Sequence, residues 1–431
     1  MEWGMSLVVL VVIMFTFLIP GVWIAISLGI TGLLGIVLSG QIKMVKTISN
    51  ISWNTTNDFI LTAIPLFLFM GEIILASGIS TKFYTSIAKW LKPVPGGLLH
   101  SNIIASSLFS AISGSSVATA AGIGSAAIPE MKKRGYRKEL IYGSIASGGT
   151  LGILIPPSIV LILYGSITEE SVIRLFSAAV VPGIVLTLLF ILYTLSVTLI
   201  KKNRVKDDFS TDISFLESLK GILPLVALMV IILGSLYTGK ITPTESAAVG
   251  SFLSLIIGRY LGHLNVKKIV LAAKNAIKTT TMIVFIMIGA QIFSFAIVSS
   301  GINRELTTWV ADMGFSPLGL LLVVCLIYII LGCVMDGPSM MLLTIPLIFP
   351  LIVQAGYDPI WFGIVLVILI ELGQITPPMG LNLFVIQSID PESKISEVVK
   401  GVIPYVLIML VMVAILIAFP DLALWLPSTI K

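Results

Sequence analysis

Two proline pairs and two Gly/Ser-rich stretches interrupt otherwise apolar segments of the chain. The pairs are Pro156-Pro157 and Pro377-Pro378, and the other two breaks are Ser113-Gly114-Ser115-Ser116 and Met335-Asp336-Gly337-Pro338-Ser339. Proline lacks a backbone donor and clashes with the preceding helical turn, so carbonyl oxygens before each pair lose their helical partners. Freed carbonyls suit a small hard cation such as Na⁺, whereas the N-terminus of a half-helix suits an anion.

The four breaks supply two mirrored sets of candidate Na⁺ ligands, because each Gly/Ser-rich tip is expected to meet the proline-broken span of its own half. The first predicted site consists of Ser113, Ser116, Gly152, Ile155 and Pro157, and the second of Gly337, Gly373, Thr376 and Met379. Any one break could be a proline kink with close glycine packing. Four breaks in mirrored positions favour ion and substrate binding.

A carboxylate at these breaks would depend on dipolar donors, since no Lys or Arg lies near them in the sequence. Bound Na⁺ would supply positive charge, because burying an unpaired carboxylate is costly. The candidate substrate residues follow the helix restarts: Ser115, Thr119, Ser158, Pro338 and Asn382. The Asn382 amide could instead bond a neighbouring carbonyl.

Two acids lie in the second set of breaks. Asp336 could neutralise a cation or cap the helix that follows it. Glu371 could couple protons or act between two rigid bodies, because an ionisable group at membrane depth suggests a function.

The two sets of breaks belong to a long internal repeat. Several landmarks recur in order at offsets of 221 to 223 residues: Ser77-Gly78-Ile79 with Ser300-Gly301-Ile302, Gly135-Tyr136 with Gly356-Tyr357, Gly152 with Gly373, Pro182 with Pro404, and Pro20 with Pro243. The polar stretch 201–220 separates the repeats 1–200 and 221–431. We interpret this stretch as a cytoplasmic linker.

Each half is expected to hold the same elements in the same order. Two apolar segments, 5–19 and 21–39, precede an amphipathic stretch at 41–57 that lies along the membrane interface. A long span, two short arms, a span broken at Pro-Pro and an unbroken span follow. The corresponding segments of the second half begin at 221–238, 244–262 and 263–279, with its long span at 281–299 and its arms within 317–354.

The short arms determine the predicted topology. Residues 98–112 and 117–130 are each shorter than the roughly 20 residues that a bilayer requires. Joined at the Ser113–Ser116 break, they suit a re-entrant hairpin, whose irregular backbone is tolerated where protein covers it or it lines a cavity. Each half then crosses five times, so the second half is inverted. The expected fold is an all-α polytopic membrane protein with an inverted repeat.

The distribution of charge supports this topology independently. If the ends of the first hairpin are cytoplasmic, 20 of the 26 Lys and Arg residues lie inside, as the positive-inside rule requires. The loops of the second hairpin hold a single basic residue, Arg304. Both termini are then periplasmic.

Composition excludes several other classes of protein. The chain is 57% hydrophobic and 11% charged, which a soluble domain could not accommodate. It has no basic stretch with interleaved aromatics, so nucleic acid is not an expected partner. Cys325 and Cys333 fit small core residues, and the sequence lacks a nucleophile elbow or metal-ligand spacing. An enzyme is therefore not expected.

The motifs at the breaks resemble one family over essentially the whole chain, the DctM-like large membrane subunit of tripartite ATP-independent periplasmic (TRAP) transporters. The segments that carry the resemblance are Ile64-Pro65-Leu66-Phe67, Ser113-Gly114-Ser115-Ser116-Val117-Ala118-Thr119, Ile128-Pro129-Glu130-Met131, Ile155-Pro156-Pro157-Ser158, Met335-Asp336-Gly337-Pro338 and Thr376-Pro377-Pro378-Met379-Gly380.

This resemblance implies an uptake system of the bacterial inner membrane. Such subunits act with a small four-helix membrane subunit and a periplasmic substrate-binding protein. They import carboxylates, such as C4-dicarboxylates or sugar acids, with Na⁺ as coupling ion. A transport core, here about 98–165 and 317–388, would move as an elevator against the remaining scaffold in the lipid bilayer. The alternative is a self-sufficient homodimeric carboxylate:cation symporter or antiporter.

Overall fold

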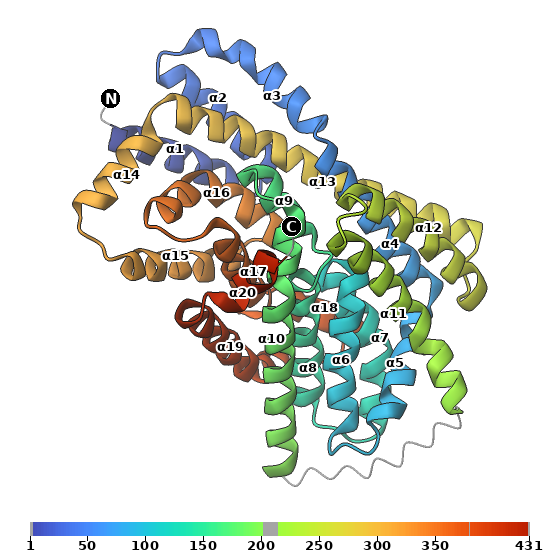
Figure 1. Cartoon of the computed structure of the whole chain (residues 1–431). Helices are drawn as coiled ribbons and strands as arrows, with labels where there is room; N and C mark the ends of the chain where they lie inside the picture. The colour runs from blue at the N-terminus through green and yellow to red at the C-terminus, as the bar shows by residue number, and fades with distance from the viewer. Residues whose placement is uncertain (1–2, 201–213, 379, 430–431) are drawn as a thin grey trace.

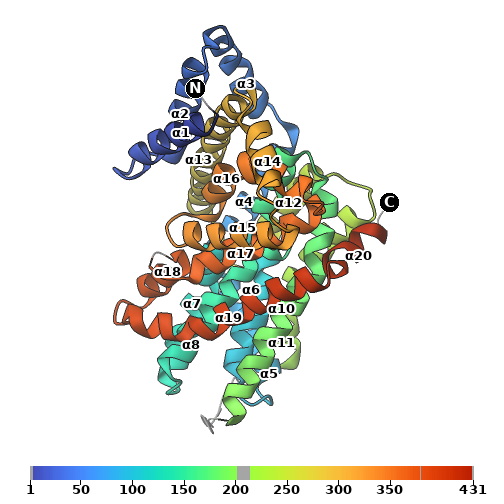
Figure 2. The same ribbon diagram turned by 90° about the vertical axis from the view of Figure 1, so that its left-hand side faces the viewer.

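The structure is a computed structural model that describes residues 3–200, 214–378 and 380–429, and within these ranges it contains helices and no strand. Seven helices in the described ranges are long and apolar enough to cross a membrane. Figures 1 and 2 show α1, α2 and α3 gathered with part of α13 at one end of the molecule, and α6, α7, α8 and α18 packed together towards the other. The predicted polytopic helical class is therefore confirmed.

The elements of the first half appear in the predicted order. Two apolar helices are followed by a polar stretch, a span, a hairpin, a broken span and a long closing helix: α1 (Trp3–Leu18), α2 (Ile24–Leu38), η1 (Ile42–Lys46), α3 (Thr47–Thr56), η2 (Phe59–Thr62), α4 (Ala63–Ser77), α5 (Ile79–Leu91), α6 (Gly97–Ser113), α7 (Ser116–Lys133), α8 (Lys138–Leu154), α9 (Ile159–Thr168) and α10 (Val172–Ile200).

The second half follows a similar order of elements. It contains α11 (Phe215–Tyr237), α12 (Pro243–Leu261), α13 (Val266–Ser299), α14 (Ile302–Asp312), α15 (Pro317–Gly332), α16 (Gly337–Gln354), α17 (Pro359–Ile375), α18 (Leu381–Ile389), α19 (Ile395–Ala418) and α20 (Asp421–Thr429). The inversion of one half relative to the membrane stays a prediction.

The second interfacial stretch differs from its prediction. Residues 263–279 were expected to form a separate element before a span at 281–299, but α13 is one helix of 34 residues. No proline interrupts it, and no Asn-Asp pair like Asn57-Asp58, which separates α3 from the following span in the first half. The polar and apolar segments are therefore continuous in the second half only.

Two short amphipathic helices were missed by the sequence analysis. α5 and α14 each follow a span directly, after Gly78 and Gly301 at φ 76° and 75°. A left-handed residue ends one helix and lets the next start at a new angle, which glycine allows without strain. α11 begins at Phe215, within the last part of the predicted linker 201–220, with a capping box formed by Ser214 and Glu217. The cytoplasmic linker stays a prediction. Residues 201–213 lie outside the described residues.

The hairpins and broken spans form the packed centre of the molecule. α6 and α7 pack on α8, α15 and α16 pack on α17, and α17 packs on α8. α17 is the most completely buried of the described helices, since every residue from Ile360 to Ile375 is buried. The division into a moving core and a scaffold stays a prediction.

Candidate functional site

The first tip is shaped by a glycine and a serine cap. Gly114 ends α6 in the left-handed conformation, at φ 59°. Ser115 is the N-cap of α7, and its hydroxyl accepts a hydrogen bond from the backbone N–H of Ala118 at 3.4 Å. The hydroxyls of Ser113 and Thr119 lie 2.7 Å apart across the turn. The tip is thus a tight turn lined by hydroxyl groups.

This tip lies against the broken span of its own half, as the sequence predicts. A Cβ atom added at Gly152 would be 2.7 Å from the carbonyl oxygen of Ser115, and one at Gly114 would be 3.1 Å from the carbonyl oxygen of Pro157. Both positions therefore require glycine, because a side chain at either would separate the tip from the span. All five predicted ligands of the first Na⁺ site, Ser113, Ser116, Gly152, Ile155 and Pro157, lie on the tip or on the broken span that it meets. Their binding of Na⁺ stays a prediction.

The second tip meets the second broken span in the same manner. A Cβ atom at Gly332 would lie 2.7 Å from the Cα atom of Gly373, and one at Gly337 would lie 3.2 Å from Nε2 of Gln374. The Pro156-Pro157 and Pro377-Pro378 peptide bonds are both cis. Predicted ligand Met379 lies outside the described residues.

The two pairs of breaks are also joined across the halves of the chain. The Ser116 hydroxyl donates a hydrogen bond to Oε1 of Gln374 and lies 3.4 Å from Oδ1 of Asn382. Nδ2 of Asn382 donates to the carbonyl oxygen of Ala146 at 3.1 Å. All three side chains are buried. Ser116, Gln374 and Asn382 therefore form a polar cluster that brings the first tip to the second broken span.

Gln374 is the member of this cluster that the sequence analysis did not assign. It lies one residue after Gly373 and is 5% exposed despite its amide. A buried polar group requires partners, so an amide two residues before Thr376 and the Pro-Pro pair could have been noticed from the sequence. Its partner could not, because Ser116 lies 258 residues away.

The second broken span offers fewer free oxygens than proline chemistry alone implies. The backbone N–H of Thr376 bonds the Gly373 carbonyl at 3.2 Å, and that of Gly380 bonds the Thr376 carbonyl at 3.2 Å. The Thr376 hydroxyl donates to the Leu372 carbonyl at 2.6 Å. Each carbonyl oxygen keeps a second lone pair, so these atoms can still bind a cation.

The two half-helix N-termini differ in electrostatic character. Asp336 caps α16, because its carboxylate accepts from the backbone N–H of Ser339 at 3.3 Å. Of the two roles considered for Asp336, capping is thus observed. α7 is capped by the neutral Ser115, and Val117 beside it is exposed. A bound anion would meet the Asp336 carboxylate at the N-terminus of α16 but no carboxylate at the N-terminus of α7. The N-terminus of α7 is therefore the better place for a substrate carboxylate.

The remaining predicted substrate residues are placed as follows. Ser158 is the N-cap of α9 and accepts from the backbone N–H of Leu161 at 3.4 Å. Pro338 lies in the first turn of α16, where its missing N–H costs nothing. Asn382 makes the bond to a neighbouring carbonyl that was considered as its alternative role, through its Nδ2 atom.

Glu371 is buried in the middle of the packed centre. Its side chain is fully inaccessible, and among the described residues neither carboxyl oxygen has a hydrogen-bond partner that meets normal geometry. It lies against the backbone of Leu154, at the end of α8. An acid in this position touches the junction of the two broken spans, but its role in coupling stays a prediction.

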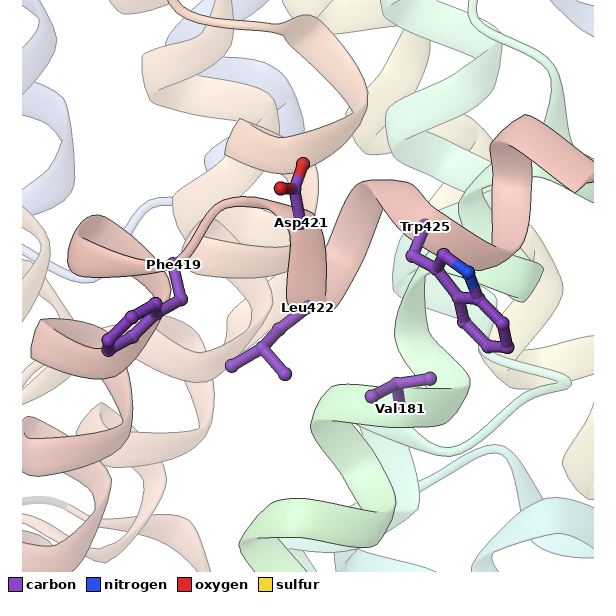
Figure 3. A pocket seen from close by; sticks show the side chains of 5 residues that line it. All are labelled: Val181, Phe419, Asp421, Leu422 and Trp425. Atoms are coloured by element: carbon purple, nitrogen blue, oxygen red, sulfur yellow. The ribbon is translucent and has the colours of Figure 1, made fainter.

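The described residues contain no group of three or more His, Cys, Asp or Glu side chains that could hold a metal ion. The breaks offer carbonyl and hydroxyl oxygens, which are suitable ligands for Na⁺. A separate surface hollow of about 490 Å³ lies between α10 and α20 (Figure 3). It is lined by Val181, Phe419, Asp421, Leu422 and Trp425, none of which belongs to a break.

A polytopic bundle with broken spans meeting paired hairpin tips is typical of membrane transport proteins. Residues 11–422 match the family described as tripartite ATP-independent periplasmic transporter, DctM component. The chain belongs to this DctM family, whose members are permease subunits and not enzymes. It is therefore a multi-pass protein of the inner membrane.

Individual relatives agree with this assignment. The chain is 36% identical to a C4-dicarboxylate TRAP transporter large permease protein of Pseudomonas aeruginosa, over 93% of this chain and 94% of the relative. It is 29% identical to a sialic acid TRAP transporter large permease protein of Vibrio cholerae, over 86% and 87%. The YdaH transporter of Alcanivorax borkumensis has a similar fold, with a TM-score of 0.59, 16% identity and coverage of 89% and 88%.

Proposed function

We propose that this chain is the large permease subunit of a TRAP system that takes up a small organic anion, a carboxylate such as a C4-dicarboxylate or a sugar acid, together with Na⁺. The observation that carries the proposal is the cluster of Ser116, Gln374 and Asn382. It places hydroxyl and amide groups where two hairpin tips and two broken spans meet.

The coupling of anion to cation follows from charge. No Lys or Arg lies near the breaks in the sequence, so a carboxylate at the α7 N-terminus is favoured by the helix dipole and by Na⁺ bound nearby. Bound Na⁺ should increase affinity for the anion, and linkage requires the anion to increase affinity for Na⁺ by the same factor. The names of the relatives, which refer to C4-dicarboxylate and sialic acid, support the carboxylate class.

Two partners are part of the proposal. The TRAP assignment implies a small membrane subunit and a periplasmic substrate-binding protein that delivers the anion. The scaffold half-helices and residues 41–58 are the proposed docking surface for the small subunit. The transport core, about 98–165 and 317–388, would carry the bound anion by an elevator movement, with both termini of the chain in the periplasm.

Uptake by proteoliposomes tests the proposal. The chain is reconstituted with and without the small subunit and the binding protein, and radiolabelled succinate and sialic acid are each offered under an inward Na⁺ gradient. We expect little uptake by the chain alone and gradient-dependent uptake by the complete system. Replacing the Na⁺ gradient with a K⁺ gradient of equal size is the control. Strong uptake by the chain alone would favour the self-sufficient symporter, and uptake indifferent to Na⁺ would refute the coupling.

A further inference from the structure

The N-terminal part of α13 carries a row of lysines that no part of the proposed transport cycle uses. Lys267, Lys274 and Lys278 are all exposed. Spacings of seven and four residues place them within an arc of about 40° on a helix with about 3.6 residues per turn. None of the ion pairs between described residues involves them. The row is therefore a single cationic face.

Exposed aliphatic side chains flank this row. Val266, Val270 and Ile277 lie on one side of it, and Leu271 lies on the other. Val266 and Ile277 are 75% and 63% exposed. A soluble anion would neutralise the lysines but leave these side chains in water. A ligand with a charged head and an apolar body would satisfy both.

The length of α13 leaves its lysines outside the apolar segment that could cross a membrane. Its 34 residues extend about 51 Å at a rise of about 1.5 Å per residue, whereas the hydrocarbon core is about 30 Å thick. The apolar part towards Ser299 is long enough to cross that core. About 14 residues then project beyond it, and these residues contain all the lysines of the helix.

The surroundings of the row are also mainly cationic. α13 contains no Asp or Glu, and Arg259 lies in the last turn of the preceding α12. Nζ of Lys82 donates to the Leu261 carbonyl at 2.8 Å, which adds a further positive charge at this end. The acid Glu72 is close to α13, where it accepts a hydrogen bond from Asn275 at 2.9 Å.

We propose that Lys267, Lys274 and Lys278 bind the headgroups of several anionic phospholipids, with this arm of α13 tilted towards the membrane surface so that the flanking aliphatic side chains reach the boundary between headgroups and acyl chains. Charge complementarity and the apolar flanks favour this ligand, because lysines beside a spanning helix attract anionic lipid within a Debye length of the membrane surface. The site would hold the exposed arm of α13 at the membrane surface. It is independent of the proposed transport function.

Native mass spectrometry of the purified chain tests this site with phosphatidylglycerol and phosphatidylcholine of identical acyl chains. We expect phosphatidylglycerol to bind at least about tenfold more tightly than phosphatidylcholine, since each lysine near the membrane surface adds to the attraction for an anionic headgroup. The triple variant Lys267→Gln, Lys274→Gln, Lys278→Gln should lose most of this preference. A control variant of equal charge, Lys92→Gln, Lys133→Gln, Lys400→Gln, should keep it.

The outcomes separate this lipid from other ligands. Equal binding of the two lipids, or equal loss in both triple variants, would overturn the proposal. Displacement of phosphatidylglycerol by millimolar inorganic phosphate would show a site for free anions instead. If the α13 triple variant loses a co-expressed membrane subunit but keeps the lipid preference, the surface binds protein. Should the triple variant fail to fold, the single variants Lys274→Gln and Lys278→Gln must each weaken phosphatidylglycerol binding.

Discussion

Ser116, the first residue of α7, donates a hydrogen bond to Oε1 of Gln374, near the end of α17. The two residues are 258 positions apart and belong to different halves of the chain. This contact makes the first tip and the second broken span parts of one polar cluster. A substitution at one residue should therefore change how much a substitution at the other alters stability. A double-mutant cycle can measure this coupling.

We predict that Ser116→Ala and Gln374→Met are not additive. Each should lower stability by about 1 kcal/mol, because each leaves a buried polar partner without its hydrogen bond. The double variant should be about as stable as the less stable of the two single variants, within about 0.5 kcal/mol. Thermal unfolding in detergent measures this. Ser110→Ala is a matched control whose effect should add to that of Gln374→Met, since the buried Ser110 hydroxyl bonds the Ser107 carbonyl within the same helix. Additive effects for Ser116 and Gln374 would contradict the contact.

Asp336 should have separable roles as a cap and as a charge. Asp336→Asn keeps a good N-cap for α16, so stability should change little, whereas Asp336→Ala should cost about 1 kcal/mol. If the carboxylate also neutralises Na⁺, the Asn variant should require several times more Na⁺ for half-maximal uptake. Melting temperature and Na⁺-dependent uptake of both variants distinguish the roles. An unchanged Na⁺ requirement in Asp336→Asn would limit this residue to capping.

Much of the fold follows from local sequence, and what was missed depends on tertiary contacts. The hairpin arms 98–112 and 117–130 are observed as α6 and α7, because apolar runs and a glycine-serine break determine them locally. The continuity of α13 was missed because a change from polar to apolar residues does not itself end a helix. Capping by Asp336 is a local contact that the sequence offered as one of two roles. The role of Gln374 as partner of Ser116 depends on how the chain folds back, which composition and spacing do not contain.

The predicted inversion has a direct chemical test. Cysteines introduced at Lys133 and Lys400 should react with a membrane-impermeant maleimide only from the cytoplasmic side, and those at Asp312 and Asp358 only from the periplasmic side. The expectation rests on the positive-inside rule. Labelling in right-side-out and inside-out vesicles measures it, with a cysteine at buried Ile364 as an unreactive control. If Lys133 and Asp358 positions react from the same side, the halves are not inverted.

An ion pair outside the spanning helices should make stability depend on pH. Asp390 accepts hydrogen bonds from Lys132 at 2.9 Å and from the Tyr142 hydroxyl at 2.7 Å. Burial alone would raise the pKa of Asp390, but these bonds outweigh it and hold the pKa below its ordinary value. A lowered carboxyl pKa stabilises the fold above the unfolded value, and this stability is lost as pH falls through the folded value.

The melting temperature of the native chain should therefore decrease as pH falls below about 4, the ordinary pKa of an aspartate. Asp390→Asn should be less stable at neutral pH by about 2 kcal/mol, because it removes the buried carboxylate that bonds both Lys132 and Tyr142. The difference in melting temperature between the native chain and Asp390→Asn should become smaller at acid pH. Glu392→Gln is the control, since this exposed acid lies 3.3 Å from the same lysine and should matter little. A difference that is constant with pH would refute the role of Asp390.

The two residues of the second broken span should differ in which ligand they affect. Asn382 is connected to the first tip through Ser116, whereas Thr376 lies at the proposed cation site. Asn382→Ala should raise the half-saturating substrate concentration more than that of Na⁺, and Thr376→Ala should raise both, since loss of Na⁺ removes the charge that attracts the anion. Uptake in proteoliposomes, measured while each ligand is varied at saturating concentration of the other, gives these values. Ser388→Ala, an exposed change on the same helix as Asn382, should leave both unchanged. If Asn382→Ala changes neither half-saturating substrate concentration nor maximal rate, the substrate does not contact this cluster.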